Sequence, residues 1–252
     1  MATRTALLSL ISLLPVACTI PSSLLAPPQG GARQGENVTI DVFYEDVEFG
    51  EIEVDGGLTG GGGTATDVFI DDAASRERIG VHASGGIKAI RGYVRVFTET
   101  FTLNDTMPTG LDTGGAGLVF PTDFDMFGVS FGLEGDPGLV DLGSDTELIL
   151  RYRLGASASQ GDDGLTDLAY AEIEGEVGIG FDWMGLRPVV GAQFSALKGE
   201  IENQNDPEIE GMVNAGGFVD LRYRPDNTPF FASVRGSFGD LEGVQVMAGF
   251  VF

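Results

Sequence analysis

Residues 169–183 read AYAEIEGEVGIGFDW; every odd-numbered position is apolar or glycine, and the intervening positions include Glu172, Glu174 and Glu176. Successive side chains of a β-strand point to opposite faces, so this stretch predicts a strand with one apolar and one polar face. A tilted strand needs ~9–11 residues to cross a bilayer, whereas strands of soluble proteins have ~5–6. The stretch therefore has the length and the pattern of a membrane-crossing strand.

The same alternation recurs along the chain and predicts ten strands, with no segment of helical period between them. Their approximate ranges are 38–49, 79–83, 90–96, 127–133, 148–156, 169–183, 186–196, 213–223, 230–238 and 244–252. The first strand changes phase at Val47 and Phe49, which predicts a β-bulge there. A count of eight strands is the alternative, with the region before Gly85 as a periplasmic segment or lid.

Connections of different length are expected at the two ends of these strands. Residues 85–86, 184–185 and 225–228 predict short turns at one end, which also has a longer connection, 135–145. Long connections at the other end include 98–125 and 199–210. Short turns on the inner side and longer loops outside are typical of outer-membrane barrels.

Composition excludes several classes of function. The 252 residues include 14 Lys+Arg and 38 Asp+Glu, a formal net charge of −24, which repels nucleic-acid phosphates. One cysteine and one histidine exclude an intramolecular disulfide, a zinc finger and any site that needs two imidazoles. Outside the N-terminus, no apolar run reaches the ~18 residues of a transmembrane helix.

The N-terminal region predicts export. Residues 1–26 resemble a secretory signal peptide, because Arg4 precedes an apolar run over 6–16 and small residues follow. Residues 27–36 form a Pro- and Gly-rich linker, and 37–252 form a single β-barrel domain.

The only cysteine, Cys18, lies where the apolar run ends. The sequence around it, LLPVAC, resembles the lipobox of bacterial lipoproteins, although Pro15 stands where that family prefers Leu. The resemblance implies that Cys18 is acylated. A passive cysteine inside an ordinary cleaved signal is the alternative.

Aromatic and basic side chains favour a membrane barrel over a soluble β-fold. Large aromatics end the apolar faces at one rim, as in the girdle at a membrane interface; they are Phe181, Trp183, Tyr223, Phe230, Phe250 and Phe252. Ten arginines have the parity of the polar face, which avoids the ~2–4 kcal/mol cost of a charge at mid-bilayer; they are Arg76, Arg78, Arg91, Arg95, Arg151, Arg153, Arg187, Arg222, Arg224 and Arg235. Lys88 and Lys198 have the apolar parity at predicted strand ends, where they can reach the interface.

These features together resemble small bacterial outer-membrane β-barrel proteins of the OmpA-like, up-and-down porin-type kind. The signal, the alternating strands and the terminal sequence VQVMAGFVF carry the resemblance. It implies an all-β fold, an antiparallel up-and-down transmembrane β-barrel of 8–10 strands. It also implies that the barrel assembly machinery recognises the last strand through Phe252.

The polar faces of the last six strands carry matched arginines and carboxylates, which predicts a nearly neutral barrel interior. The expected lumen-facing charge network includes Arg151, Arg153, Glu172, Glu174, Glu176, Asp220, Arg222, Arg224 and Arg235. Such a network fills the interior of a narrow barrel. A small polar pore lined by the same charges is the alternative.

No catalytic site, metal site or cofactor is expected. Glu172, Glu174 and Glu176 have the spacing of any lumen-facing row, and His82 lacks a Ser or Asp partner at a motif spacing. The acidic loop residues lack the spacing of known calcium motifs. The Gly-rich stretch 60–63 lacks the lysine of a phosphate-binding loop.

We therefore expect a non-catalytic protein of the outer membrane of a Gram-negative-type bacterium, with a structural, surface or passive small-solute pore role. Its expected partners are outer-membrane lipid and the barrel assembly machinery, with no nucleic acid. The alternative is an exported soluble β-sandwich or adhesin-like binding module, tethered to lipid through Cys18.

Overall fold

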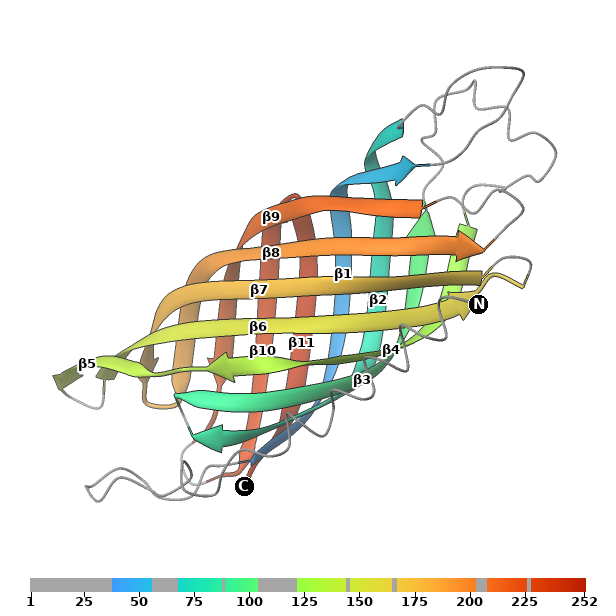
Figure 1. The fold of residues 1–252 in the computed structure, drawn as a ribbon. Helices are drawn as coiled ribbons and strands as arrows, with labels where there is room; N and C mark the ends of the chain where they lie inside the picture. Colours follow the sequence, from blue (N-terminus) through green and yellow to red (C-terminus); the bar gives the residue numbers. More distant parts are fainter. Residues whose placement is uncertain are drawn as a thin grey trace, which may run out of the picture.

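The computed structural model is a single antiparallel β-sheet that closes on itself (Figure 1). It describes residues 38–55, 68–87, 89–103, 122–143, 146–164, 167–202, 208–225 and 228–252. The strands are β1 (Val38–Asp55), β2 (Val68–Ile87), β3 (Ile90–Leu103), β4 (Thr122–Gly135), β5 (Gly138–Gly143), β6 (Thr146–Asp162), β7 (Asp167–Trp183), β8 (Leu186–Glu202), β9 (Glu208–Tyr223), β10 (Phe230–Gly239) and β11 (Leu241–Val251). In the described part of the chain, no helix is long and apolar enough to cross a membrane.

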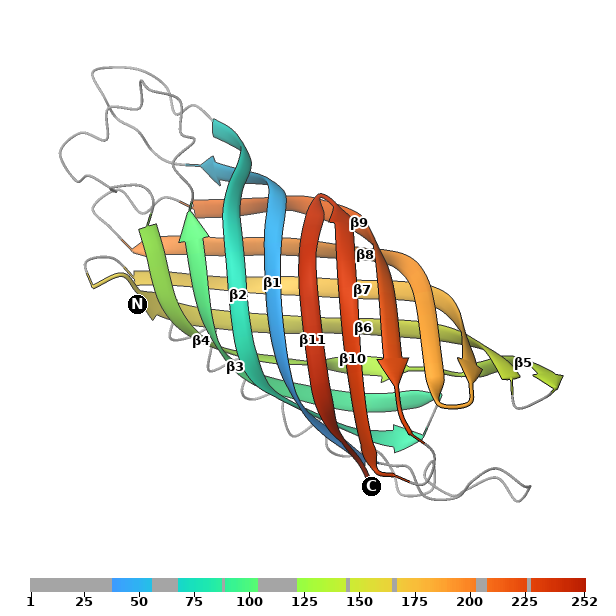
Figure 2. The ribbon, with the colours of Figure 1, turned by 180° about the vertical axis from the view of Figure 1, so that it is seen from behind.

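Ten of these strands form a closed barrel in which sequence neighbours are spatial neighbours. The sheet order is β4-β3-β2-β1-β11-β10-β9-β8-β7-β6-β5, and pairing of β4 with β6 closes the ring. The first and last strands meet along a seam, where Phe252 N donates to Val38 O at 2.8 Å (Figure 2). The predicted all-β, antiparallel, up-and-down barrel is confirmed. Closure excludes the sandwich alternative, and the membership of β1 excludes the count of eight.

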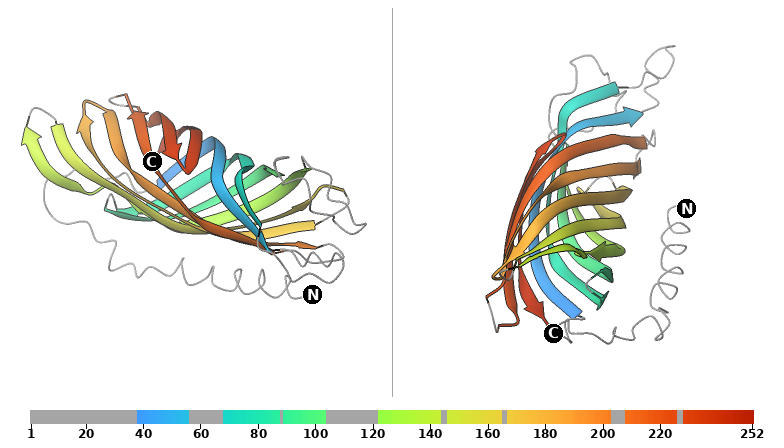
Figure 3. Two further views of the ribbon diagram at one scale, coloured as in Figure 1. Left: turned by 90° about the horizontal axis from the view of Figure 1, so that it is seen from above. Right: turned by 90° about the vertical axis from the view of Figure 1, so that its left-hand side faces the viewer.

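Both ends of the described barrel, Val38 and Phe252, lie at one rim, which we call the terminus rim; the opposite rim is the loop rim (Figure 3). The predicted turn at the terminus rim between β7 and β8 is confirmed, with Met184 and Gly185 at φ 49° and 83°. The turn predicted at 85–86 is wrong, because β2 continues to Ile87 and pairs there with Ile90.

The prediction that residues 135–145 form a connection without a strand is wrong, because they include β5. Strand β5 continues the course of β4 along β6 after a break at Asp136 and Pro137, and its residues are all exposed. Pro137 O accepts from Leu150 N at 3.0 Å, which holds the break against β6. In Figure 1, β5 extends past the rest of the terminus rim with the start of β6.

The β-bulge in β1 lies later than predicted. Val47 and Phe49 stay in register with β2, and the register shifts only between Phe49 and Glu51. Both side chains point inward, as that of Phe43 does, so the alternation of inward and outward side chains continues through Phe49. Apolar residues on the inward face misled the sequence interpretation, which assumed that apolar side chains point outward.

The two faces of the barrel wall have opposite character. Outward residues in the middle of the strands are apolar and exposed, for example Ile79 (61% exposed), Val213 (66%) and Val177. All ten arginines that were predicted to face away from this side are buried or half-buried. Lys198 is exposed on the outward side of β8, as its parity predicted, and Lys88 lies outside the described residues.

Beneath the loop rim, apolar side chains fill the lumen. This loop-rim cluster consists of Phe49, Ala74, Phe101, Leu103, Phe124, Met126, Leu168, Tyr170, Leu197 and Leu241. Two smaller apolar groups, Phe43 with Phe97 and Met247, and Ile149 with Val189 and Phe218, lie nearer the terminus rim. The interior is therefore part aromatic and part charged, which the sequence interpretation did not foresee.

Candidate functional site

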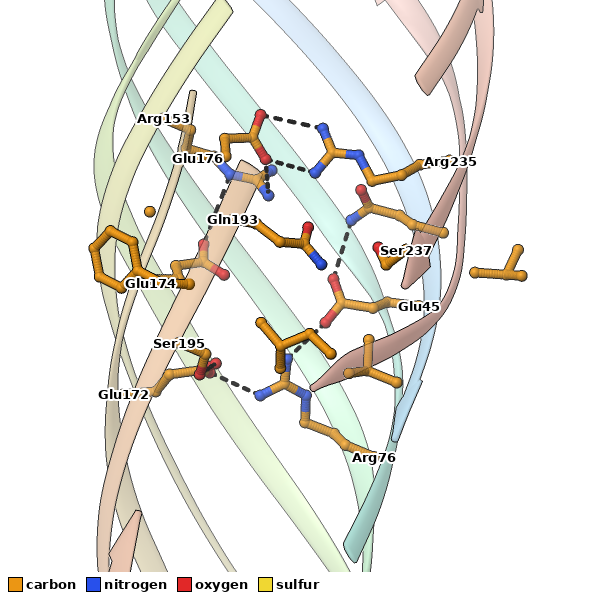
Figure 4. Close-up of a pocket in the computed structure, with 16 residues that line it drawn as sticks. Glu45, Arg76, Arg153, Glu172, Glu174, Glu176, Gln193, Ser195, Arg235 and Ser237 are labelled. Atoms are coloured by element: carbon orange, nitrogen blue, oxygen red, sulfur yellow. Dashed lines mark hydrogen bonds and ion pairs between the residues drawn. The ribbon is translucent and has the colours of Figure 1, made fainter. Parts of the chain in front are cut away.

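Below the loop-rim cluster, Glu172 joins strands on opposite sides of the lumen (Figure 4). Its Oε2 accepts from Arg76 Nη1 at 2.8 Å and from Arg78 Nη2 at 3.0 Å, while Ser195 Oγ donates to Oε1 at 2.6 Å. Arg76 also donates to Glu45 at 2.8 Å. Buried charges persist only when they are paired and hydrogen-bonded, and these four charged side chains satisfy that condition.

A second group lies one layer closer to the terminus rim. Glu176 binds Arg153 at 2.8 Å and Arg235 at 3.1 Å, from opposite sides in Figure 4. The neighbouring Glu174 accepts from the Tyr93 hydroxyl at 3.1 Å and lies 3.5 Å from Arg95. Arg153 also lies 3.9 Å from Glu174 and so links these two adjacent carboxylates of β7.

Nearest the terminus rim, Asp136 joins the break between β4 and β5 to the charge network. Its two oxygens accept from Arg91 Nη2 at 2.9 Å and from Arg151 Nε at 3.0 Å. These two contacts pair the buried Asp136 carboxylate with an arginine on each oxygen, which offsets the cost of burying its charge.

His82 has an acidic partner that sequence spacing did not reveal. Asp41 lies directly opposite it on β1, with Oδ2 2.8 Å from His82 Nδ1, although 41 positions separate the two residues. Nε2 is 3.6 Å from Glu134 and has no hydrogen-bond partner among the described residues. A nucleophilic triad needs a hydroxyl or thiol on that nitrogen.

Aromatic rings hold several of the lumen arginines in place. The guanidinium of Arg78 lies 4.4 Å from the centroid of the Phe97 ring, and that of Arg235 lies 4.3 Å from the centroid of Phe218. Such cation–π contacts are strongest when desolvated, as they are here. They explain why phenylalanines share the inward face with charges.

Two small cavities lie among the lumen side chains. A cavity of about 50 Å³ lies among Glu45, Arg76, Glu174 and Gln193, and another of about 20 Å³ lies among Arg91, Arg151 and Arg222. Cavities of this size and polarity suit a few water molecules. The filled interior, preferred over a pore in the sequence interpretation, stays a prediction.

The structure brings most of the predicted network together. Eight of its members lie in the lumen and are buried or half-buried: Arg151, Arg153, Glu172, Glu174, Glu176, Asp220, Arg222 and Arg235. Arg224 instead lies at the terminus rim, with Nε 3.5 Å from Thr228 O. Further charged members come from the first strands and were left out of that network, namely Asp41, Glu45, Arg76, Arg78, His82, Arg91, Arg95, Glu99, Glu134 and Asp136. The parity of the first strands could have included most of them.

The six predicted girdle residues, Phe181, Trp183, Tyr223, Phe230, Phe250 and Phe252, are exposed on the outward face at the terminus rim. Phe230 and Phe250 pair directly across β10 and β11, with ring centroids 6.1 Å apart. Their contact with a membrane interface stays a prediction. Cys18 lies outside the described residues. Within the described ranges, no group of three or more His, Cys, Asp or Glu side chains is arranged to hold a metal ion.

Comparison with known proteins finds no family model that matches this chain and no curated protein that matches its sequence. Among solved structures, the chain is similar to the transport unit of the autotransporter AIDA-I from Escherichia coli, with TM-score 0.42, 7% identity, and coverage of 96% of this chain and 97% of that one. A mutant of the monoaromatic hydrocarbon channel TodX matches with TM-score 0.24 and 8% identity over 94% and 70% of the two chains. These scores are low, so the barrel rests on its strand pairing, and no function is transferred.

Proposed function

We propose that this chain is a non-catalytic β-barrel protein of the bacterial outer membrane, with a structural or surface role. The observation that carries the proposal is the inverted polarity of the wall: Val213 and Ile79 are exposed outside, while Arg76 and Glu172 are buried inside. In water, each exposed apolar side chain of this kind costs free energy that contact with lipid recovers. A closed barrel also leaves no unpaired strand edge to the lipid along its ten paired strands.

The filled lumen supports a structural or surface role over a passive pore. The loop-rim cluster places apolar side chains in the lumen below the loops, and ion pairs occupy the layers beneath it. Water-filled channels need wider barrels or polar, unblocked interiors. The resemblance to small up-and-down barrels of the OmpA-like kind agrees with this role, and that subtype belongs to the proposal.

Lipid and the barrel assembly machinery are the proposed partners. The outward apolar side of β11 leads to Phe250 and Phe252. In small outer-membrane barrels, which this chain resembles, an aromatic end of the last strand is what the assembly machinery recognises. An N-terminal signal over residues 1–26 would deliver the chain to the periplasm, where both described chain ends are proposed to remain.

The proposal is tested by expressing the full chain in a Gram-negative host and separating its membranes. We expect the protein in the outer-membrane fraction, extractable only with detergent, and with faster electrophoretic migration before boiling than after. In planar bilayers we expect no steady conductance from the purified barrel. Recovery in the soluble periplasmic fraction without detergent would contradict the proposed location in the membrane. Steady channels would contradict only the proposal that the lumen is closed.

A further inference from the structure

Arg222 is a lumen cation that Asp136 and Asp220 attract without a direct ion pair among the described residues. Its guanidinium lies 5.0 Å from the centroid of the Phe231 ring, and its Nε is buried with no hydrogen-bond partner in the ranges that the structure describes. Among the described residues it makes no ion pair, unlike Arg151 and Arg235 in the same part of the lumen. A partly buried arginine that touches none of its counter-charges is costly, so its place in the barrel needs an explanation.

The nearest acidic side chains are already engaged by other arginines. Both oxygens of Asp136 bond to Arg91 and Arg151, and Asp182 binds Arg187 at 2.6 Å. Asp220 Oδ2 lies 3.0 Å from Arg151, and its Oδ1 has no hydrogen-bond partner in the described part of the chain. One water molecule between Asp220 and Arg222 is therefore the competing occupant of this place.

Further positive charge borders Arg222 on the side of the terminus rim. Arg187 lies directly opposite Arg222 in the pairing of β8 with β9, where like charges destabilise a sheet. Arg224 follows two positions later on the same side of β9, and its backbone N–H donates to Gly185 O at 2.8 Å. Arg187 and Arg222 therefore lie side by side at the terminus-rim end of the lumen. An anion between them would relieve their mutual repulsion.

We propose that this terminus-rim mouth binds a small oxyanion, a phosphate or carboxylate, with Arg222 as its main ligand and Arg187 as the second. A guanidinium presents paired N–H donors that match the oxygens of such anions. The Arg187 and Asp182 side chains are 21% and 22% exposed, so the mouth is open to water. Because Arg222 faces the lumen, the anion arrives as a free solute, and a lipid phosphate on the outer wall does not reach it.

The test is calorimetric titration of inorganic phosphate into the folded, detergent-solubilised full chain, with chloride at equal ionic strength as the reference. We expect saturable phosphate binding by the wild type. Arg222→Gln should weaken it about 10- to 100-fold, the equivalent of one lost charge-assisted contact, and Arg222→Lys should weaken it less. Lys198→Gln removes a positive charge from the outward side of β8 and should leave the affinity unchanged.

Unboiled electrophoretic mobility checks that each variant is folded. If Arg222→Gln does not fold, Arg187→Gln replaces it, with the same expected direction. Absence of saturable phosphate binding by the wild type would overturn the proposal, as would equal affinity in the folded arginine variants. Equal affinity for chloride and phosphate would contradict the proposal that the site selects oxyanions. Loss of binding when anionic lipid is added to the micelles would overturn the assignment to a free solute.

Discussion

Arg76 on β2 and Glu172 on β7 meet across the lumen at 2.8 Å, although 96 positions separate them in the chain. Removing one member of a buried pair leaves the other charge without compensation, at a cost of about 3–5 kcal/mol. We expect Glu172→Gln to lower the free energy of unfolding by this amount in lipid vesicles, measured by denaturant titration. Glu200→Gln, on the exposed side of β8, is the control and should change it by less than about 0.5 kcal/mol. Equal effects of the two substitutions would contradict the cross-lumen role of Glu172.

Substituting an arginine into the outer wall would distinguish a membrane barrel from a soluble one. Val190 is 54% exposed in the middle of the apolar side of β8. In water, Val190→Arg would be nearly neutral, whereas in a bilayer we expect a loss of about 2–4 kcal/mol in unfolding free energy. Glu200→Arg, on the same strand and the same side but near the loop rim, should cost at most about 1 kcal/mol. Similar small costs at both positions would speak against lipid contact.

Glycine at position 128 is required by close packing in the lumen. A Cβ there would overlap the Phe97 ring and Ser159 Oγ. Since overpacking of this kind costs about 1–3 kcal/mol, Gly128→Ala should destabilise the barrel by that amount in the same denaturant titration. Gly236 on β10 has no atom within 4 Å of the corresponding point, so Gly236→Ala is the matched control. If Gly236→Ala were the more harmful change, the packing at Phe97 would be wrong.

Alternation in the sequence was enough to predict ten of the eleven strands, the barrel and the outward face, because successive side chains of a strand point to opposite sides. It could not tell which inward residues touch. Arg76 and Glu172 meet only because the ring closes, and Asp41 reaches His82 only through the pairing of β1 with β2. Contacts of this kind depend on the register and curvature of the whole sheet.

The sequence interpretation failed where apolar side chains point inward. Phe49 and Phe97 have the parity of the charges, so Phe49 was read as a phase change and Phe97 was not placed at all. The structure gives the physical reason: phenyl rings stack under lumen arginines, as Phe97 does under Arg78. Strand β5 was missed because Asp136 and Pro137 interrupt its alternation with β4.

Deletion of Phe252 tests the proposed route of assembly. Phe252 closes the seam with Val38 and lies beside Phe250, with ring centroids 6.3 Å apart. We expect the deletion to lower the amount of folded protein in the outer membrane several-fold and to increase periplasmic degradation, measured by immunoblot of cell fractions. Phe252→Tyr keeps an aromatic end and should assemble normally. Wild-type levels of the deletion variant would exclude a role of Phe252 in assembly.

The central claim, that the outer wall contacts lipid, is tested most directly by the single tryptophan, because Trp183 is 52% exposed on that wall at the terminus rim. Its fluorescence is measured in vesicles whose acyl chains carry bromine, and again with aqueous iodide. A matched control moves the indole inside, by Trp183→Phe combined with Phe218→Trp. We predict strong quenching of Trp183 by brominated lipid, greatest for bromine near the headgroups, weak quenching by iodide, and no lipid quenching of the control. Quenching of Trp183 by iodide but not by brominated lipid would contradict the claim.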